Sequence, residues 1–406
     1  MFPDHGHRRI AVASPDDIAT ARRIAAERAD GVLPVDEAAR LDRLVAMVAD
    51  YALGRPDGTI LIARMHSGAG VECLAYDRDP ATVALTPSTP DGVLPALDAV
   101  LESVRGEADR FHVHATPGIG LALLARVLRP GTDDAPPADA LAQAGAVTVE
   151  RSGGDAARGG PFIDHWFVSC APARGGDGPC GIALMVDGDT AADAGPAEPP
   201  VKTDAGSGAE DGNGQDGAAQ SPTVQSPTVQ SPTIMTPAVV RQMEAVVAAT
   251  VPGLPAPVVV NAIRRDLKGR PELGLSHDRT LTRIGRSAVA VLRFDAGAVD
   301  YTALGTLAGA VVRRQEITAL GARWAMIGFN PLAPASVHLR WAPGEHVVLY
   351  TGGCARLPAL FIHRDLHGVE PTLAALVLLR DGAVSDDDHT VLVLRNCGDG
   401  VPANAV

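Results

Sequence analysis

The sequence predicts an α+β protein with two layered domains, the second interrupted by a disordered insertion. Three observations support this prediction. The first third of the chain orders its expected elements as helix, helix, strand, strand, and the last third combines short strands with few helices. Between them, residues 191–236 are rich in Ala, Gly, Pro, Asp and Ser. That stretch has too few large apolar side chains to offset the entropy lost on ordering.

Length, charge and cysteine usage limit the possible classes. The 406 residues carry 35 Lys and Arg against 48 Asp and Glu, a formal net charge of −13. We expect no nucleic-acid binding, because such proteins need a basic face. The sequence has no membrane-length apolar run and no secretory signal pattern, so we expect a cytoplasmic protein. The five cysteines form no C-x-x-C pair, which argues against a structural zinc site and a disulfide framework.

The N-terminal part opens with a short strand over residues 10–13 and a helix directly after it. Ser14 is a favourable N-cap, and Pro15 suits the first helical position. Asp16 and Asp17 follow, where acidic side chains interact well with the positive end of the helix dipole. The helix is therefore expected to begin at this point.

Further elements follow from apolar periodicity. Residues 35–53 carry one apolar stripe and are expected to form a second helix. Residues 59–65 and 71–77 are expected to form two strands of a hairpin. The glycine-containing segment 117–120 is expected to open another helix through residue 128.

The C-terminal part predicts mainly strands. A hairpin turns at Ala296 and Gly297, and residues 371–381 form a helix. The apolar segment 181–189 precedes the insertion and needs a sheet to join, so the insertion interrupts one domain rather than separating two. The remaining expected strands are residues 287–295, 298–305, 345–353 and 389–395.

Several of these segments resemble PPM-type protein phosphatases of the SpoIIE/RsbX group. The stretch APGEHVVLYTGG, followed by PTLAALVLLRDGAVSDDDHTVLVLR, is similar to their C-terminal part, where SDG follows one strand and DDxT precedes the last. ALMVDGD resembles their VVDGLGHG strand end, and SAVAVLRFDAGAVDYTALGTLAGAVV their central hairpin. The resemblance covers residues 165–190 and 237–396. It implies an αββα sandwich that hydrolyses phosphoserine with two divalent metal ions.

The resemblance also implies a metal site. It places metal-binding residues at Asp187, Gly188 and Asp387, with Mg²⁺ or Mn²⁺ as the cofactor. Pro172 and Gly352 stand where the family has further acids. Two carboxylates are few for two cations, so we expect weak metal binding. The alternative is that these acids hold no metal.

The N-terminal part resembles the RsbT-like anti-sigma kinase branch of the GHKL ATPases. SPDDIATARRIAAERA is similar to their first helix, and AARLDRLVAMVADYALGRPDGTILI to their second helix and the strand after it. Ala46 replaces the catalytic Glu, so kinase activity is not expected. Asp50 stands at the position of the Mg²⁺-holding Asn, and Asp77 matches the acid that reads adenine. Gly118 and Gly120 are candidates for the phosphate-side loop, which leaves ATP binding open.

Together the resemblances divide the chain into three parts. Residues 1–150 are the degenerate GHKL-like domain, 160–190 with 237–396 the PPM-like domain, and 191–236 an insertion with SPTVQ repeats. One implied function is a phosphatase-type regulator of a bacterial partner-switching pathway. Its partner would be a phosphorylated anti-sigma antagonist-like or anti-sigma protein. The alternative is a catalytically inactive pseudoenzyme that docks the same partners.

Two smaller features remain open. His112 and His114 alternate on a strand-like segment and would share one face, as metal ligands or as plain surface. The scattered cysteines have no recognisable histidine partner nearby in sequence, so we expect structural thiols rather than nucleophiles.

Overall fold

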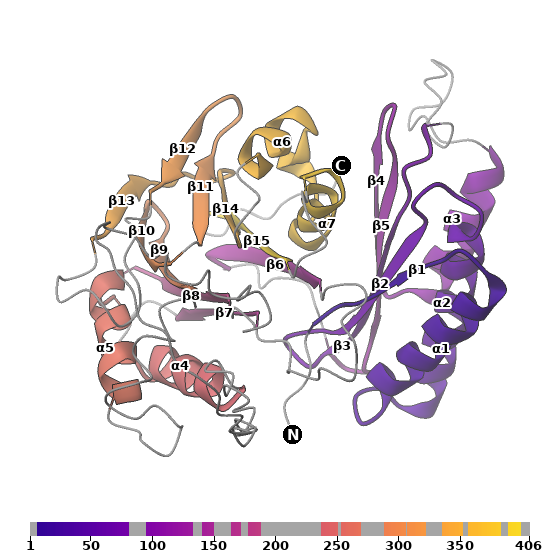
Figure 1. The fold of residues 1–406 in the computed structure, drawn as a ribbon, viewed down its shortest axis with the longest axis horizontal. Helices are drawn as coiled ribbons and strands as arrows, with labels where there is room; N and C mark the ends of the chain where they lie inside the picture. The colour runs from indigo at the N-terminus through magenta and orange to yellow at the C-terminus, as the bar shows by residue number, and fades with distance from the viewer. Residues whose placement is uncertain are drawn as a thin grey trace, which may run out of the picture. The chain divides into compact units, whose positions relative to one another are not determined.

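The computed structural model defines the fold over most of the chain outside the insertion. No helix in this part is both long and apolar enough to cross a membrane. The strands form three five-stranded antiparallel sheets, and helices pack on them (Figure 1). The residues described are 6–80, 95–132, 140–149, 164–171, 178–187, 237–250, 253–268, 288–305, 307–321, 335–351, 356–382 and 389–398.

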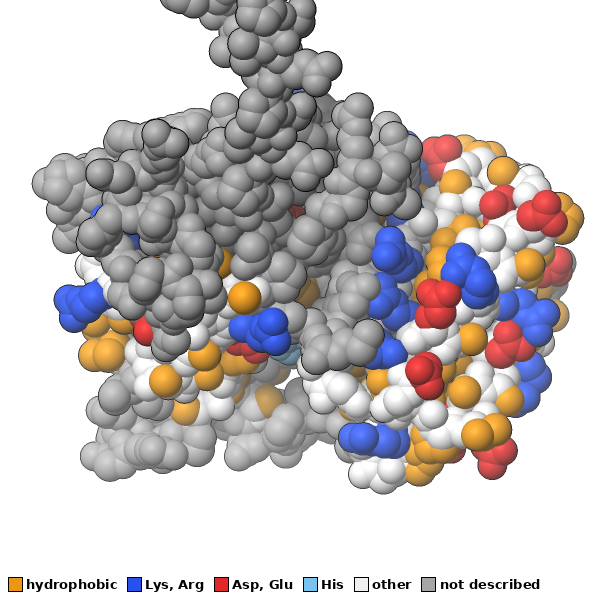
Figure 2. Space-filling model, turned by 60° about the horizontal axis from the view of Figure 1, so that its bottom comes forward, with side chains coloured by type: hydrophobic (Ala, Val, Ile, Leu, Met, Phe, Trp, Pro, Cys, Tyr) orange, Lys and Arg blue, Asp and Glu red, His pale blue; other side chains and the backbone are white. Residues whose placement is uncertain are grey.

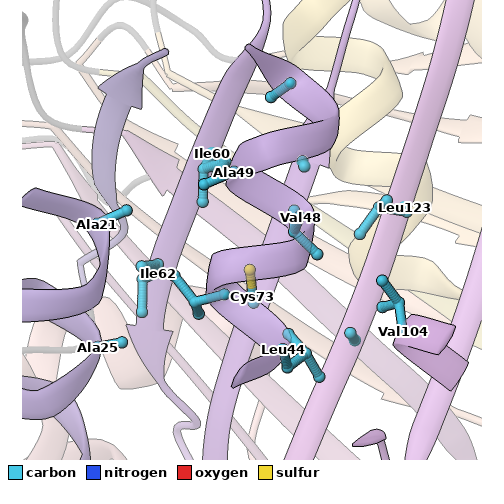
Figure 3. Close-up of a cluster of buried hydrophobic side chains, with 14 of the residues drawn as sticks. Ala21, Ala25, Leu44, Val48, Ala49, Ile60, Ile62, Cys73, Val104 and Leu123 are labelled. Carbon is cyan, nitrogen blue, oxygen red and sulfur yellow. The ribbon is translucent and has the colours of Figure 1, made fainter. Parts of the chain in front are cut away.

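The first sheet has the order β1-β2-β3-β5-β4. Three helices, α1 (Pro15–Ala29), α2 (Val35–Ala52) and α3 (Pro95–Glu107), cover one face of it. Figure 3 shows the core between them, where Leu44 and Val48 of α2 meet Cys73 of the sheet. The strands are β1 (Arg8–Ala11), β2 (Thr59–Arg64), β3 (Gly70–Tyr76), β4 (Arg110–Thr116) and β5 (Gly120–Leu128).

The predicted start of α1 is confirmed, and its bonding is visible. The Asp17 carboxylate accepts hydrogen bonds from the backbone N–H groups of Ser14 (2.8 Å) and Ala13 (3.0 Å) and from the Ser14 hydroxyl (2.9 Å). These bonds lower the pKa of Asp17. A carboxylate three residues into the helix thus satisfies backbone donors that the helix itself leaves unpaired.

Exposed ion pairs connect the outer sides of these helices. Arg22 of α1 binds Asp42 of α2 through two hydrogen bonds, of 2.8 and 2.6 Å. Basic and acidic side chains are interspersed on the right-hand part of Figure 2. Such mixed charge is typical of an ordinary solvated surface.

The other two sheets pack face to face. One has the order β13-β10-β9-β8-β7, the other β12-β11-β14-β15-β6, and a shared apolar core lies between them. Their strands are β6 (Ala142–Val149), β7 (His165–Ala171), β8 (Cys180–Asp187), β9 (Ala288–Asp295), β10 (Ala298–Leu304), β11 (Ala308–Val312), β12 (Ile317–Leu320), β13 (Val337–Arg340), β14 (His346–Tyr350) and β15 (His389–Asn396).

Helices cover both outer faces of this sandwich. The helices α4 (Pro237–Ala249) and α5 (Ala256–Lys268) pack on the β8–β9 sheet. The helices α6 (Leu357–His363) and α7 (Pro371–Gly382) pack on the β14–β15 sheet. The result is the helix–sheet–sheet–helix order that the resemblance implied.

Helix α7 is buried on all sides. Every residue from Pro371 to Gly382 except Asp381 is buried. On one side the helix contacts β6 and β15, and the same apolar cluster includes Leu61, Leu74 and Leu124 of the first sheet. The first sheet therefore has helices on both faces, and it shares α7 with the sandwich. This explains why the α7 sequence lacks a polar stripe.

One expected helix is wrong. Residues 120–128, expected as a helix, are the strand β5, paired with β3 and β4. All nine residues are buried, because helices cover both faces of the sheet. A continuous apolar run of this kind does not reveal its period. In addition, β6 lies within the range 1–150 but pairs with β15, so one sheet joins residues of the two expected domains.

A buried histidine sits under α6. His346 on β14 is 1% exposed, and its ring lies 4.9 Å from Phe361 and 5.5 Å from His367, centroid to centroid. Among the described residues, neither ring nitrogen has a hydrogen-bond partner. Burial lowers the pKa of His346 to about 3. The folded protein therefore keeps this ring neutral in mild acid.

This burial predicts acid sensitivity. When the pH falls below the ordinary histidine pKa of about 6.5, His346 takes up a proton in the unfolded chain but stays neutral in the folded protein. The free energy of unfolding should thus decrease as the pH is lowered, by up to about 1.4 kcal/mol per pH unit. Urea unfolding measures the free energy of unfolding at pH 7 and pH 5. Its decrease between these pH values should be about 2 kcal/mol smaller in His346→Leu than in the wild-type protein. The control His363→Leu, at an exposed position, should show the same decrease between pH 7 and pH 5 as the wild-type protein. Equal losses in both variants would contradict the assignment.

Candidate functional site

Two acids lie side by side at one end of the sandwich. Asp187 is the last residue of β8, and the register pairs His165 of β7 with Val186. Continued by one residue, this antiparallel register brings Asp164 to the position opposite Asp187. Cβ atoms of directly opposed residues in such pairs are about 5 Å apart. Asp164 is only 8% exposed. Sequence reasoning missed Asp164; the available signal was a single acid directly before an apolar strand.

The start of β15 reaches the same end. The Thr390 side-chain oxygen lies 3.1 Å from Oδ2 of Asp164 and 3.1 Å from the Thr148 hydroxyl on β6. The Thr390 N–H donates to the hydroxyl of Thr351, which follows β14 (3.1 Å). Strands of both sheets therefore meet around Asp164.

The other sequence-predicted metal residues are not described by the structure. Gly188 directly follows Asp187, and Asp387 lies three residues before Thr390; both fall outside the described residues. So do Pro172 and Gly352. The structure thus brings together the end of β8 and the start of β15, the elements that flank Gly188 and Asp387.

The donor chemistry at this end suits a hard divalent cation. Mg²⁺ and Mn²⁺ prefer oxygen ligands, and Mg²⁺ is usually held by one or two carboxylates together with several waters. Asp164 and Asp187 supply two neighbouring carboxylates. Within the described part of the chain, no group of three or more His, Cys, Asp and Glu residues forms a metal site.

In the N-terminal part, Asp77 is fully engaged by the protein. It is 0% exposed, and its Oδ2 accepts a 2.5 Å hydrogen bond from the Tyr51 hydroxyl. Its Oδ1 accepts from the backbone N–H groups of Leu121 (3.0 Å) and Asp79 (3.2 Å). The Arg55 guanidinium lies 3.9 Å from Oδ2 and stacks over the Tyr51 ring. A carboxylate with these partners is not free to read an adenine.

Gly118 lies in the turn between β4 and β5, and Gly120 is the first residue of β5, so neither is at a helix N-terminus. The expected phosphate-side loop is therefore corrected, because no helix follows it. Gly118 has φ +74°, which favours glycine. A Cβ on Gly120 would lie 2.4 Å from Oδ1 of Asp77. Gly120 thus lets the backbone approach Asp77 closely and completes its burial.

Asp50 is exposed and lines a pocket of about 730 Å³. The pocket also includes Tyr51, Arg55 and Asp79, together with Ser103 of α3. Tyr51, which lines this pocket beside Asp50, donates its hydroxyl to the Asp77 carboxylate.

Burial also affects the protonation of several cysteine and histidine candidates among the described residues. Burial raises the pKa of Cys73 to about 12 and of Cys170 to about 11, so these thiols stay protonated. His112 and His114 both lie on β4. Burial lowers the pKa of His114, which favours its neutral form.

Comparisons with known proteins find low similarity. No protein-family model matches the sequence, and no curated protein matches it. The PP2C phosphatase domain of SpoIIE from Bacillus subtilis, with a fragment of its regulatory domain, aligns with TM-score 0.38 and 13% identity over 94% of this chain and 98% of that chain. The serine/threonine phosphatase PstP from Mycobacterium tuberculosis aligns with TM-score 0.39 and 11% identity, over 63% of this chain and 98% of that chain. RsbX in complex with magnesium aligns with TM-score 0.37 and 11% identity, over 63% of this chain and 94% of that chain. Scores this low carry no argument about this chain.

The bond between Tyr51 and Asp77 predicts a stability effect. Tyr51→Phe should lower the free energy of unfolding by about 1.5–3 kcal/mol, because a buried carboxylate loses a charge-assisted donor. The matched control is Tyr301→Phe, which removes a 3.2 Å bond to the neutral carbonyl of Leu307 and should cost about 1 kcal/mol. Urea unfolding measures both. A Tyr51→Phe loss no larger than that of Tyr301→Phe would contradict this role of Tyr51.

Proposed function

We propose that this chain is a metal-dependent phosphatase-type regulator that acts on a phosphorylated serine or threonine of a partner protein. The observation that supports this proposal is the placement of Asp164 beside Asp187, with Thr390 of β15 bound to Asp164. The resemblance implied carboxylates at the end of β8 and before β15. The described residues supply a third acid, Asp164, at the same end of the sandwich.

Each residue has a distinct role in this proposal. The carboxylates of Asp164 and Asp187 would hold the cation, with Asp387 contributing from the segment before β15. A Mg²⁺ or Mn²⁺ ion held by these carboxylates would supply an activated water and charge neutralisation for phosphoryl transfer. Thr390 holds Asp164 through the hydroxyl contact.

The third acid bears on the choice between enzyme and pseudoenzyme. Two carboxylates would hold divalent ions weakly, whereas three approach a workable donor set. We therefore favour turnover over docking alone. The proposed partner is a phosphorylated anti-sigma antagonist-like or anti-sigma protein in a partner-switching pathway.

The N-terminal part is proposed as a docking scaffold rather than a nucleotide-binding unit. Tyr51 and two backbone N–H groups already donate to the Asp77 carboxylate, which is 0% exposed. Calorimetric titration of the Mg²⁺-saturated full chain with Mg²⁺-ATP should therefore give no binding heat. A measurable heat that disappears in an Asp50→Asn variant would contradict the scaffold role and restore a nucleotide site.

The phosphatase proposal predicts loss of metal binding and activity in two variants. The full-length variants Asp187→Asn and Asp164→Asn should lose Mn²⁺ affinity. Electron paramagnetic resonance of the free Mn²⁺ ion measures this affinity. Hydrolysis of a phosphoserine peptide should fall at least about 100-fold, since removing a ligand exceeds the 10–100-fold cost of an outer partner. The matched control is Asp36→Asn, an exposed acid at the start of α2, which should behave as wild type.

The controls separate the two functions. Wild-type protein that binds Mn²⁺ but hydrolyses neither the peptide nor p-nitrophenyl phosphate would favour the docking module. Wild-type protein that binds no Mn²⁺ would remove the metal site altogether.

A further inference from the structure

A buried histidine joins the first sheet to the sandwich. His7 is 2% exposed, and its backbone N–H donates to the Thr148 carbonyl (2.9 Å). The Thr148 backbone N–H donates to Nδ1 of the His7 ring (3.3 Å). Since Nδ1 accepts, the neutral ring carries its proton on Nε2. That nitrogen lies 3.2 Å from the Glu72 carboxylate on β3 and donates to it. One side chain therefore bonds to both the first sheet and β6.

The Glu72 end is anchored firmly. Arg126 of β5 binds Glu72 at 3.1 Å, lies 3.3 Å from Glu370, and donates to the Thr372 hydroxyl at 2.8 Å. Burial alone would raise the pKa of Glu72, but Arg126 and His7 hold it below the usual value. The histidine is thus fixed to an ionised cluster at the N-terminal end of α7.

The Thr148 end leads to the candidate metal site. A hydroxyl has one proton, and an ionised carboxylate can only accept. Thr390 therefore donates to Asp164 and accepts from the Thr148 hydroxyl, at 3.1 Å each. Thr148 and Thr390 are 2% and 0% exposed, so water does not compete for these bonds. The bonds run from Glu72 through His7 and the two threonines to Asp164.

We propose that His7, Thr148 and Thr390 are positioning residues that orient the Asp164 carboxylate beside Asp187. Through them, docking of the first sheet against β6 sets the geometry of a cation site in the sandwich. The proposal rests on the proposed function, because it assigns these residues to the same site. It adds that the metal affinity of the sandwich depends on contacts made by the N-terminal part.

The direct test is Thr390→Val in the full-length protein, which removes the donor and keeps the branched shape. Mn²⁺ affinity, measured by electron paramagnetic resonance, should fall about 10-fold, as for other outer partners of metal ligands. The KM for p-nitrophenyl phosphate should stay unchanged while kcat at subsaturating Mn²⁺ falls. Thr390→Ser keeps the hydroxyl and should restore wild-type affinity.

The matched control is Thr302→Val on β10. Thr302 is 0% exposed, and its hydroxyl has no hydrogen-bond partner within the described part of the chain. This variant makes the same buried substitution in the same sandwich and should leave Mn²⁺ affinity unchanged. It separates loss of the bond from general effects of removing a buried hydroxyl.

Two further variants test the more distant links and remain available if Thr390→Val fails to fold. Thr148→Val and His7→Leu should each weaken Mn²⁺ binding roughly threefold, because they act through Thr390 rather than on Asp164 itself. Thermal unfolding confirms that each variant is folded at the temperature of the metal titration.

The outcomes separate this inference from the proposed function. If Asp164→Asn and Asp187→Asn lose Mn²⁺ while folded Thr390→Val, Thr148→Val and His7→Leu bind it as wild type does, the positioning role is wrong and the metal site stands. If the two Asp variants bind Mn²⁺ normally, the proposed function is wrong, and the positioning role is lost with it.

Discussion

Helix α7 is buried between two sheets, and this burial holds the N-terminal part and the sandwich together. A helix with apolar residues all round is stable in water only when every side of it is covered. Here β6 and β15 cover one side, and Leu61, Leu74 and Leu124 of the first sheet contribute to the cover. Neither sheet alone can satisfy this helix. The N-terminal part and the sandwich are therefore bound by a shared core rather than by a surface contact.

Buried ionic groups fix both ends of that helix. At its start, Glu370 and the Thr372 hydroxyl meet Arg126 of β5. At its end, the fully buried Arg380 side chain binds Asp381 (2.7 Å) and the Thr116 hydroxyl (2.7 Å). Buried charges gain little net stability after desolvation, but a shifted helix would leave them unpaired. We infer that these ionic groups at the two ends of α7 fix the position of the helix along its apolar contacts with the two sheets.

Two buried acids show how partners decide what a carboxylate can do. Asp77 is surrounded by donors from Tyr51, Leu121 and Asp79, so its charge is satisfied within the fold. Asp164 accepts a hydrogen bond from the Thr390 hydroxyl and stands at the register position opposite another acid, Asp187. Two neighbouring acids repel each other unless a cation or a proton intervenes. This difference underlies the separate roles proposed for the two halves of the chain.

Elements with strong short-range signals could be predicted from the amino-acid sequence. The start of α1 after Ser14 follows from capping chemistry, the hairpin at Gly297 from turn residues, and the helix–sheet–sheet–helix order from a family resemblance. Tertiary structure alone decided β5, because a strand buried on both faces shows no period. It also decided the partners of Asp164 and Asp77. Those contacts join residues 226 and 26 positions apart, and only packing brings such distant side chains together.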